Sequence, residues 1–180
     1  MKTKFRIISV ILLMLFTQSF SFDGEGDGSV DSPYQITTVA QLNQVHDEID
    51  ANYILMNDLD LLGSFFYGIG AEKDIFDRAF SGVFDGKGYI IKNFVIRGFN
   101  LENYGLFARN TGTIKNLGLE NVKGLFDSKK YIGALIGRMD GGKVDNCYVI
   151  GATLSGDAYV GGLIGYAENG EVLIVIVRFL

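Results

Sequence analysis

Five aspartates between positions 58 and 85 are the side chains of this sequence best suited to chemistry. Asp58 and Asp60 alternate by two, so on a β-strand they would share one face. Two carboxylates on one face can act as general acid and base on a glycosidic bond, or can hold calcium. Aspartates also serve as solvated groups or turn caps, so both interpretations stay open for the set Asp58, Asp60, Asp74, Asp77 and Asp85.

The sequence lacks the residues that other kinds of catalytic site require. His46 is the single histidine, so a zinc site with two histidines cannot be built, and no nucleotide-binding glycine motif occurs. Cys147 is the single cysteine, which excludes an intrachain disulfide and favours a small buried hydrophobe over a reactive thiol. The carboxylates at positions 23, 27 and 31 do not have the spacing of an EF-hand loop, which favours a solvated linker over a calcium site. We therefore expect no catalytic activity, no cofactor and no metal.

Three tyrosines offer a binding surface instead. Tyr104, Tyr131 and Tyr159 each precede a glycine motif, so in a stacked repeat they would form one column on one face. Exposed tyrosines provide rigid contact area for sugars or protein surfaces. The alternative is that these rings pack inward or cover a neighbouring loop.

An internal repeat must position these residues. The run YIGALIG at 131–137 returns as YVGGLIG at 159–165, and a shorter copy, YGLF, lies at 104–107. Each copy is followed by a glycine turn and then by a second strand signal: IKNF at 91–94, IKNL at 114–117 and VDNC at 144–147. This pattern predicts a mainly β protein, a right-handed parallel β-helix or β-solenoid with about three stacked coils between residues 80 and 177.

The aligned asparagines predict a structural ladder. Asn93, Asn116 and Asn146 would lie at one turn of successive coils, with their side-chain amides stacked. The residue after each asparagine would point inward, so we expect Phe94, Leu117 and Cys147 to form one apolar column.

The chain before the repeats divides into three parts. Residues 1–21 resemble a secretory signal peptide, with a basic start, a ten-residue apolar run from Ile7 to Phe16 and cleavage after about Ser21. Residues 22–32 are rich in Gly and Asp and predict a flexible leading segment. Residues 33–79 predict an N-terminal cap with the first strands and one short helix from about Val39 to Asp47, started by a capping box of Thr38 and Gln41, with His46 on its surface.

Composition and charge limit the class of protein. The 180 residues are 48% hydrophobic with 24 Gly and one Pro, which suits one β domain. Loss of Lys2, Lys4 and Arg6 with the leader takes the net charge from −5 to −8. An acidic surface repels phosphate backbones, so nucleic acid is not an expected partner. The apolar run in the leader is too short to span a membrane, so no stable span is expected after cleavage.

The combined motifs resemble the GLUG repeats of bacterial surface proteins and large adhesins. The resemblance covers about residues 31–172 and rests on DSPYQI at 31–36, YILMNDLD at 53–60, FSGVFDGKGY at 80–89 and the repeats quoted above. It implies a β-solenoid on an exported protein with an adhesive or scaffolding role.

The repeat changes at its end. Where the pattern predicts an asparagine at position 174, the chain reads LIVIVRFL from 173 to 180, so the last coil of the 80–180 repeat region is atypical or truncated. An apolar edge strand of this kind favours self-association. We expect a secreted or cell-surface, adhesin-like module that binds a host or cell-surface protein or glycan. A structural scaffold segment of a larger surface protein and a carbohydrate-active β-helix enzyme are the alternatives.

Overall fold

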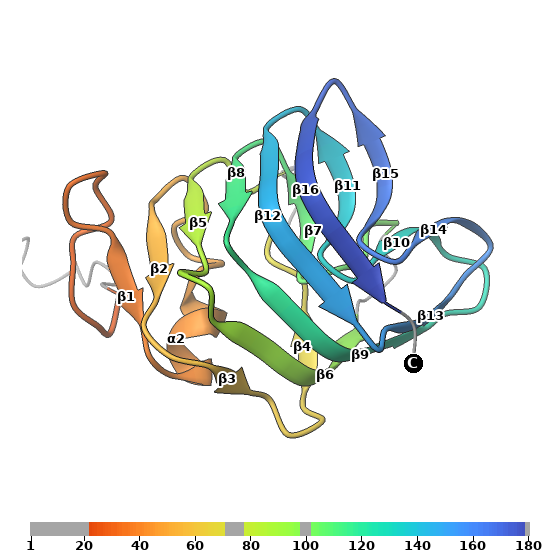
Figure 1. Ribbon diagram of the computed structural model, residues 1–180, viewed down its shortest axis with the longest axis horizontal. Coiled ribbons are helices and arrows are strands. Elements are labelled where there is room, and N and C mark those ends of the chain that lie inside the picture. Colours follow the sequence, from red (N-terminus) through yellow and green to blue (C-terminus); the bar gives the residue numbers. More distant parts are fainter. Residues whose placement is uncertain (1–21, 71–77, 98–101, 179–180) are drawn as a thin grey trace, which may run out of the picture.

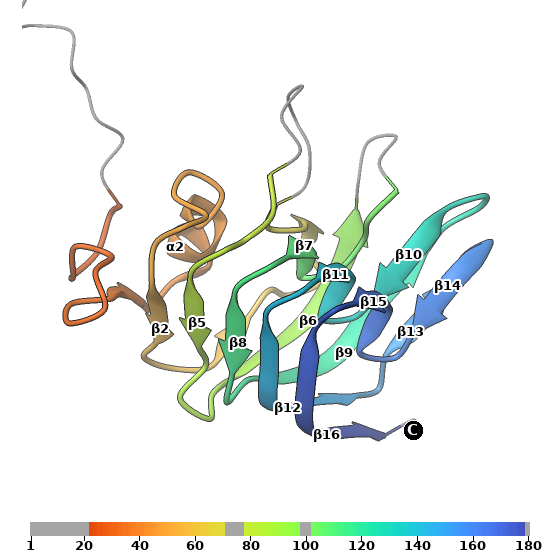
Figure 2. The same ribbon diagram turned by 90° about the horizontal axis from the view of Figure 1, so that it is seen from above.

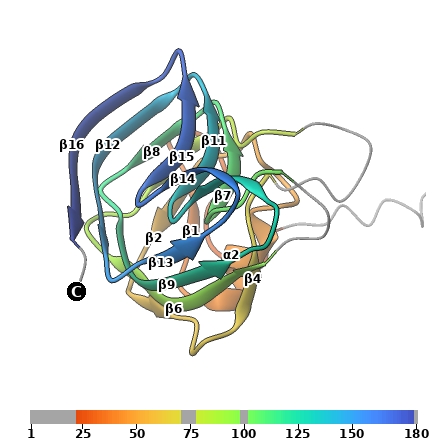
Figure 3. The same ribbon diagram turned by 90° about the vertical axis from the view of Figure 1, so that its right-hand side faces the viewer.

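The fold is a right-handed parallel β-solenoid of about four turns in a computed structural model that describes residues 22–70, 78–97 and 102–178. The predicted signal peptide lies outside the described residues. The chain winds from the N-terminal end at the left of Figure 1 to the C-terminal end at the right, and Figure 3 looks along the coil axis. The predicted fold class is confirmed. None of the helical structure in these ranges has the length and hydropathy that a membrane span needs.

Three faces of stacked strands form the wall of the solenoid. The first face stacks β1 (Tyr34–Ile36), β2 (Tyr53–Leu55), β5 (Val83–Asp85), β8 (Thr113–Lys115) and the first residues of β12 (Lys143–Ile150) and β16 (Glu171–Arg178). The second stacks β3 (Leu59–Asp60) and β4 (Phe65–Tyr67) on β6 (Ile90–Arg97), then β9 (Gly118–Leu125), followed by the last residues of β12 and β16 and by β13 (Thr153–Ser155). The third holds the sheet of β7 (Phe107–Asn110), β11 (Ile136–Asp140) and β15 (Ile164–Glu168), beside the pair β10 (Lys130–Gly133) and β14 (Ala158–Gly161).

Successive coils stack in register. Thr113 pairs with Lys143, and Lys143 pairs with Glu171, so each coil returns the chain to the same position in the wall. Parallel pairing places each inward side chain on its equivalent in the next coil, as for Phe84, Ile114 and Val144. All three of these side chains are fully buried. The core is therefore a set of apolar columns that run along the solenoid axis.

Aromatic rings form the column at the N-terminal end. Phe22 stacks on Tyr34 with ring centroids 4.5 Å apart, and Tyr34 lies 5.5 Å from Tyr53. The series continues to Phe84, whose ring meets the edge of Phe107 at 5.3 Å. These contacts join the first residues described to the middle of the solenoid.

Stacking begins well before residue 80. β1 pairs with β2, and β2 pairs with β5, so the described strands before residue 80 already stack on those of the repeat region. The early coils lack the glycine motif that marks the later ones, so the sequence repeat can be recognised only from about residue 80. Their stacking depends on backbone hydrogen bonds, which leave no sequence signature.

The predicted helix exists but is shorter than expected. α2 (Val39–Gln44) begins at the capping box, where the Thr38 side chain and the Gln41 side chain each accept from the other residue's backbone N–H. It ends when the Val45 N–H bonds to the Leu42 carbonyl, which tightens the last turn. His46 therefore lies in the following turn, half-buried, with its ring 6.1 Å from Phe66. It is not the surface helix residue that the sequence predicted.

Residues 22–32 are folded against the first coil. The Gln35 N–H donates to the Glu25 carbonyl, and the Asn52 N–H donates to the Gly28 carbonyl. Gly26 has a φ of +95°, and a Cβ there would collide with the Pro33 carbonyl oxygen, so only glycine fits this turn. The predicted flexible segment is thus an ordered cover for the N-terminal end of the core. Within the described residues, no three His, Cys, Asp or Glu side chains are grouped as metal ligands would be.

The inward column predicted after the asparagines is correct in part. Phe94, Leu117 and Cys147 are all buried. Leu117 and Cys147 are equivalent residues of neighbouring coils, but Phe94 pairs with Val122 and so belongs to another column. Burial raises the pKa of the Cys147 thiol to about 11.

Cys147 is predicted to resist thiol reagents in the native protein. A pKa of about 11 leaves far less thiolate at pH 8 than an ordinary cysteine has, and the sulfur is also covered by the core. We expect labelling by a disulfide reagent to be at least about a hundredfold slower in the folded protein than in denaturant. Because the chain holds one cysteine, a single labelling trace measures this ratio, and fast native labelling would contradict the buried position.

Candidate functional site

A cluster of three tyrosines lies on the outer surface where β10 and β14 meet the sheet of β11 and β15. The Tyr131 and Tyr159 rings are stacked, 4.9 Å apart and 13° from parallel. The Tyr166 ring on β15 meets the edges of both rings at 5.5 Å. Tyr159 is 52% exposed, and the other two rings are half-buried. These three residues form what we call the tyrosine cluster.

The backbone turns the stacked rings outward. Tyr131 and Tyr159 have φ values of 54° and 55°, in the left-handed region that side chains rarely adopt. Each lies between two residues that pair across β10 and β14, Lys130 with Ala158 and Ile132 with Val160. The left-handed residue bends the strand at this point, so both tyrosines project from the same corner of the solenoid.

Tyr104 is not part of this column, so that prediction is wrong. It pairs with Ile132 and not with Tyr131, is 1% exposed, and packs on Phe126 at 4.1 Å between ring centroids. The coil that contains Tyr104 is one residue shorter at this point, since the stretch 104–107 lies opposite the stretch 132–136 of the next coil. An alignment of Gly105 with Gly133 would have placed Tyr104 inward.

The sequence did not single out Tyr166, although the repeat register places it opposite Arg138. It pairs with Arg138 of the preceding coil, and Arg138 pairs with Arg109 of the coil before that. The repeat period therefore places a row of polar and aromatic residues on β7, β11 and β15, beside the stacked tyrosines.

Charged groups surround the tyrosine cluster. The Arg138 guanidinium carbon lies 5.7 Å from the Tyr131 ring and 5.6 Å from the Tyr166 ring, within reach of a cation–π interaction. Its Nε donates to one carboxylate oxygen of Asp140 at 2.6 Å, and the Nε of Arg109 donates to the other at 2.5 Å. Burial alone would raise the pKa of Asp140, but the two arginines outweigh it and hold that pKa below its usual range. Asp140 thus keeps Arg138 fixed against the rings.

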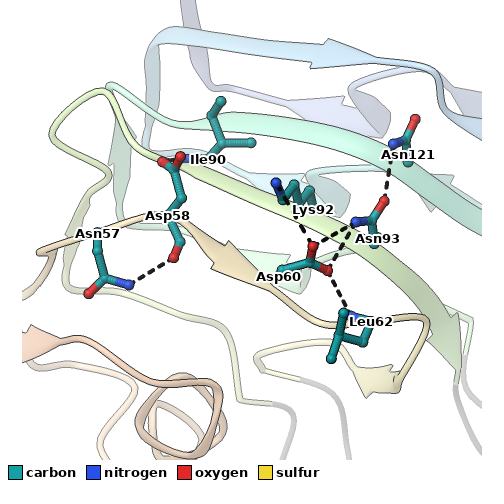
Figure 4. A network of polar contacts seen from close by, with 8 residues as sticks. All are labelled: Asn57, Asp58, Asp60, Leu62, Ile90, Lys92, Asn93 and Asn121. Atoms are coloured by element: carbon teal, nitrogen blue, oxygen red, sulfur yellow. Dashed lines mark hydrogen bonds and ion pairs between the residues drawn. The ribbon is translucent and has the colours of Figure 1, made fainter.

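The asparagines form two ladders instead of one. In the first, the Asn116 amide donates to Asp85 at 3.0 Å and the Asn146 amide donates to Asn116 at 2.9 Å. In the second, shown in Figure 4, the Asn93 amide donates to both oxygens of Asp60. The Asn121 amide then donates to Asn93 at 3.0 Å.

The predicted single ladder of Asn93, Asn116 and Asn146 is therefore wrong for Asn93. Asn93 lies in the middle of the long strand β6 and is in register with Asn121, whereas Asn116 and Asn146 lie one corner earlier. All four asparagines have φ between 50° and 58°. Asparagine tolerates this left-handed conformation better than most residues, so each ladder marks a corner of the solenoid.

The described candidate catalytic aspartates are bonded within the wall of the solenoid, Asp60 and Asp85 at turns and Asp58 to the next coil. Asp58 accepts from the Ile90 N–H, and Asp60 accepts from the Leu62 N–H and lies 3.9 Å from the Lys92 ammonium. Asp85 accepts from the Lys87 N–H. Asp74 and Asp77 lie outside the described residues. Each described aspartate of the set is thus bonded to a backbone N–H, and for Asp60 and Asp85 this agrees with the turn-capping interpretation. A shallow groove of about 390 Å³ beside the second ladder is lined by Asn93, Asn121 and Lys123.

Comparison with known proteins shows partial similarity to two much longer chains. The sequence is 32% identical to a protein named Halomucin from Haloquadratum walsbyi, over 82% of this chain and 2% of that protein. It is 34% identical to a protein named "Putative Gly-rich membrane protein" from Evansella cellulosilytica, over 69% of this chain and 15% of that one. The chain thus spans only a small part of each relative. No protein-family model matches the sequence, and no solved structure matches it.

Substitutions at Asn116 separate the contribution of its side-chain amide from that of its left-handed backbone conformation. Asn116→Ala removes the amide and places alanine at φ 52°, so we expect a loss of about 2–3 kcal/mol in the free energy of unfolding. Asn116→Gly removes the amide but tolerates the backbone, so about 1 kcal/mol is expected. Denaturant unfolding measures the free energy of unfolding of both variants. Asn43→Ala, at an exposed residue of the helix, is the control and should change that free energy little. If both variants lost the same free energy of unfolding, the left-handed backbone at position 116 would not contribute to the cost of the alanine substitution.

The ion pairs of Asp140 predict an acid-dependent stability. The pKa of Asp140 is lower in the folded state than in the unfolded state, where it is about 3.9. The contribution of Asp140 to the free energy of unfolding is therefore complete above the unfolded-state pKa and is lost as the pH falls through the folded-state pKa. Asp140→Asn should lower the free energy of unfolding at pH 7 by about 1–3 kcal/mol. The difference from wild type should shrink below about pH 4. Urea unfolding from pH 7 to pH 2 tests this, with the exposed Asp157→Asn as control; a constant difference across this range would contradict it.

Proposed function

We propose that this chain is a non-catalytic, adhesin-like binding module on the outside of the cell, which contacts a glycan through the tyrosine cluster. The single observation that supports the proposal is the exposure of the Tyr159 ring beside a fixed arginine. Tyr159 is held on one face by Tyr131 yet stays 52% exposed, and Arg138 lies against the neighbouring rings. Rigid aromatic surfaces with polar neighbours suit sugars, because ring faces contact C–H groups while charged groups bond hydroxyls.

The location rests on separate support. The first 21 residues have the pattern of a secretory leader. One of the two relatives is named as a membrane protein, and the GLUG-like motifs favour an exported repeat protein. We infer that the module is secreted or displayed at the cell surface.

The absence of catalysis is part of the proposal. Asp58, Asp60 and Asp85 are each bonded to a backbone N–H, and two of them end an asparagine ladder. Carboxylates so committed are poor candidates for the two opposed groups that glycoside cleavage requires. A purely structural scaffold is the second candidate, and it predicts no ligand at the tyrosine cluster.

A glycan-array screen tests the proposed glycan binding. The screen uses the exported protein, purified after expression of the full sequence. For any bound glycan we expect Tyr159→Ser to weaken binding about tenfold, because a ring contact is lost, and Tyr131→Ser with Tyr159→Ser to abolish it. Titration calorimetry measures the affinities, and circular dichroism confirms the fold. Tyr89→Ser, at a tyrosine that is 37% exposed directly before β6, is the control.

The outcomes separate the candidates. Unchanged affinity in the folded double variant would remove the tyrosine cluster from the function. Absence of glycan binding by the wild type would favour the scaffold, and release of reducing sugar would favour the enzyme.

A further inference from the structure

The second asparagine ladder stops at a glycine. Its two amides, Asn93 and Asn121, lie on β6 and β9, which stand side by side along the solenoid with β13 next to them (Figure 2). β9 pairs in one unbroken register with the end of β12 and with β13, so the residue equivalent to Asn121 in the next coil is Gly151. Both have a left-handed φ, 54° for Asn121 and 68° for Gly151. The corner thus continues into the next coil, but the row of side-chain amides does not.

The open end of this ladder is a hydrogen-bond acceptor. The Asn93 amide donates to Asp60, and the Asn121 amide donates to the Asn93 oxygen (Figure 4). From the residues that the structure describes, the Oδ1 of Asn121 receives no hydrogen bond. The bond from Asn93 holds the pKa of Asp60 below its usual range, so the ladder begins at a negative charge at neutral pH. This charge polarises the amides and strengthens the acceptor at the other end.

A groove lies beside this acceptor. It has a volume of about 390 Å³ and reaches from Gly63 to Gly151 across four successive coils. Small-molecule sites have volumes of roughly 300–1,000 Å³, so the groove suits a ligand at the small end of that range. Lys123 also lines the groove, two residues after Asn121 on β9. The groove therefore presents a strong acceptor and an ammonium donor close together.

An exposed aromatic ring borders the groove. Val95 lines the groove, and Phe65 pairs with Val95 from the preceding coil. Phe65 is 59% exposed, and the Arg97 guanidinium carbon lies 4.3 Å from the centre of its ring. This cation–π contact holds the ring in place. A fixed, exposed ring suits contact with the C–H groups of a sugar.

These groups fit an acetamido group on a sugar ring. A secondary amide has an N–H donor beside a carbonyl acceptor, so it can donate to the Asn121 Oδ1 and accept from Lys123. Its N–H then replaces the asparagine amide that is missing at position 151. A peptide also carries amides, but extended peptides bind by adding to a free strand edge, and β6 and β9 are each paired on both sides. The amide and aromatic contacts together favour an amino sugar over a peptide.

We infer that this groove binds an N-acetylated amino sugar of a glycan, with the acetamido N–H on the Oδ1 of Asn121. The glycine at position 151 is what opens the site, because an asparagine there would use the same acceptor within the ladder. The groove lies on the second face of the solenoid, whereas the tyrosine cluster lies on the third. The inference therefore does not rest on the function proposed for the tyrosine cluster.

Paired titrations of two trisaccharides test the site. The probes are the β-1,4-linked trimers of N-acetylglucosamine and of glucose, which differ only in the group at carbon 2. Calorimetry uses the exported protein with Tyr131→Ser and Tyr159→Ser, so that any binding at the tyrosine cluster is removed. We expect the acetylated trimer to bind at least about tenfold more tightly, because only it makes the amide contact.

Gly151→Asn tests the role of the missing amide. Asparagine tolerates the left-handed backbone and would donate to the Asn121 oxygen. We expect the affinity for the acetylated trimer to fall at least about tenfold, while the free energy of unfolding stays the same or rises. Ser155→Asn adds the same side chain at an exposed position of β13 that does not line the groove, and it should leave the affinity unchanged.

Nuclear magnetic resonance of the wild type gives a measurement that needs no variant. The side-chain amide signal of Asn121 should shift as the acetylated trimer is added, and that of Asn146 in the first ladder should not. The inference would be overturned by an Asn121 signal that does not move, by equal affinity for the two trimers, or by full binding to folded Gly151→Asn. Equally tight binding of a short peptide of asparagine and glycine would also overturn the assignment to a sugar.

Discussion

Stacking of parallel coils in register is the constraint on which the structure depends. Each coil must return the chain to the same position in the wall, or the backbone hydrogen bonds and the inward columns both fail. The chain satisfies this by bending sharply at single residues in the left-handed region. Asn116 with Asn146, Asn93 with Asn121, and Tyr131 with Tyr159 occupy three such corners, and each pair is in contact across the coils.

This constraint also determines which side chains are free for function. The corner asparagines use their amides on each other, and Asp60 and Asp85 end the two ladders. Groups that could perform chemistry in another fold are thus bonded within the wall. The corner with Tyr131 and Tyr159 differs because its side chains carry large apolar rings, so stacking there creates an exposed aromatic surface.

Stacking has a further consequence at the ends of the array. Every coil covers the one before it, so the first and last coils each need another partner. Phe22, α2 and the turn at Gly26 supply that cover at the N-terminal end. In the last described strands, Val172 of β16 and Val160 of β14 are exposed although their equivalents Val144 and Ile132 are buried.

The sequence by itself determined those features that depend on neighbouring residues or on the repeat. The return of the YIGALIG motif as YVGGLIG predicted the solenoid, and the capping box at Thr38 predicted the start of α2. The position of Cys147 directly after the aligned Asn146 predicted its burial. Each of these depends on neighbouring residues or on a close repeat. Tertiary structure alone decided that Tyr104 points inward, that Asn93 joins Asn121, and that residues 22–32 cover the core. The physical reason is that coils differ slightly in length, and only the pairing of distant backbone groups decides where an extra residue is accommodated.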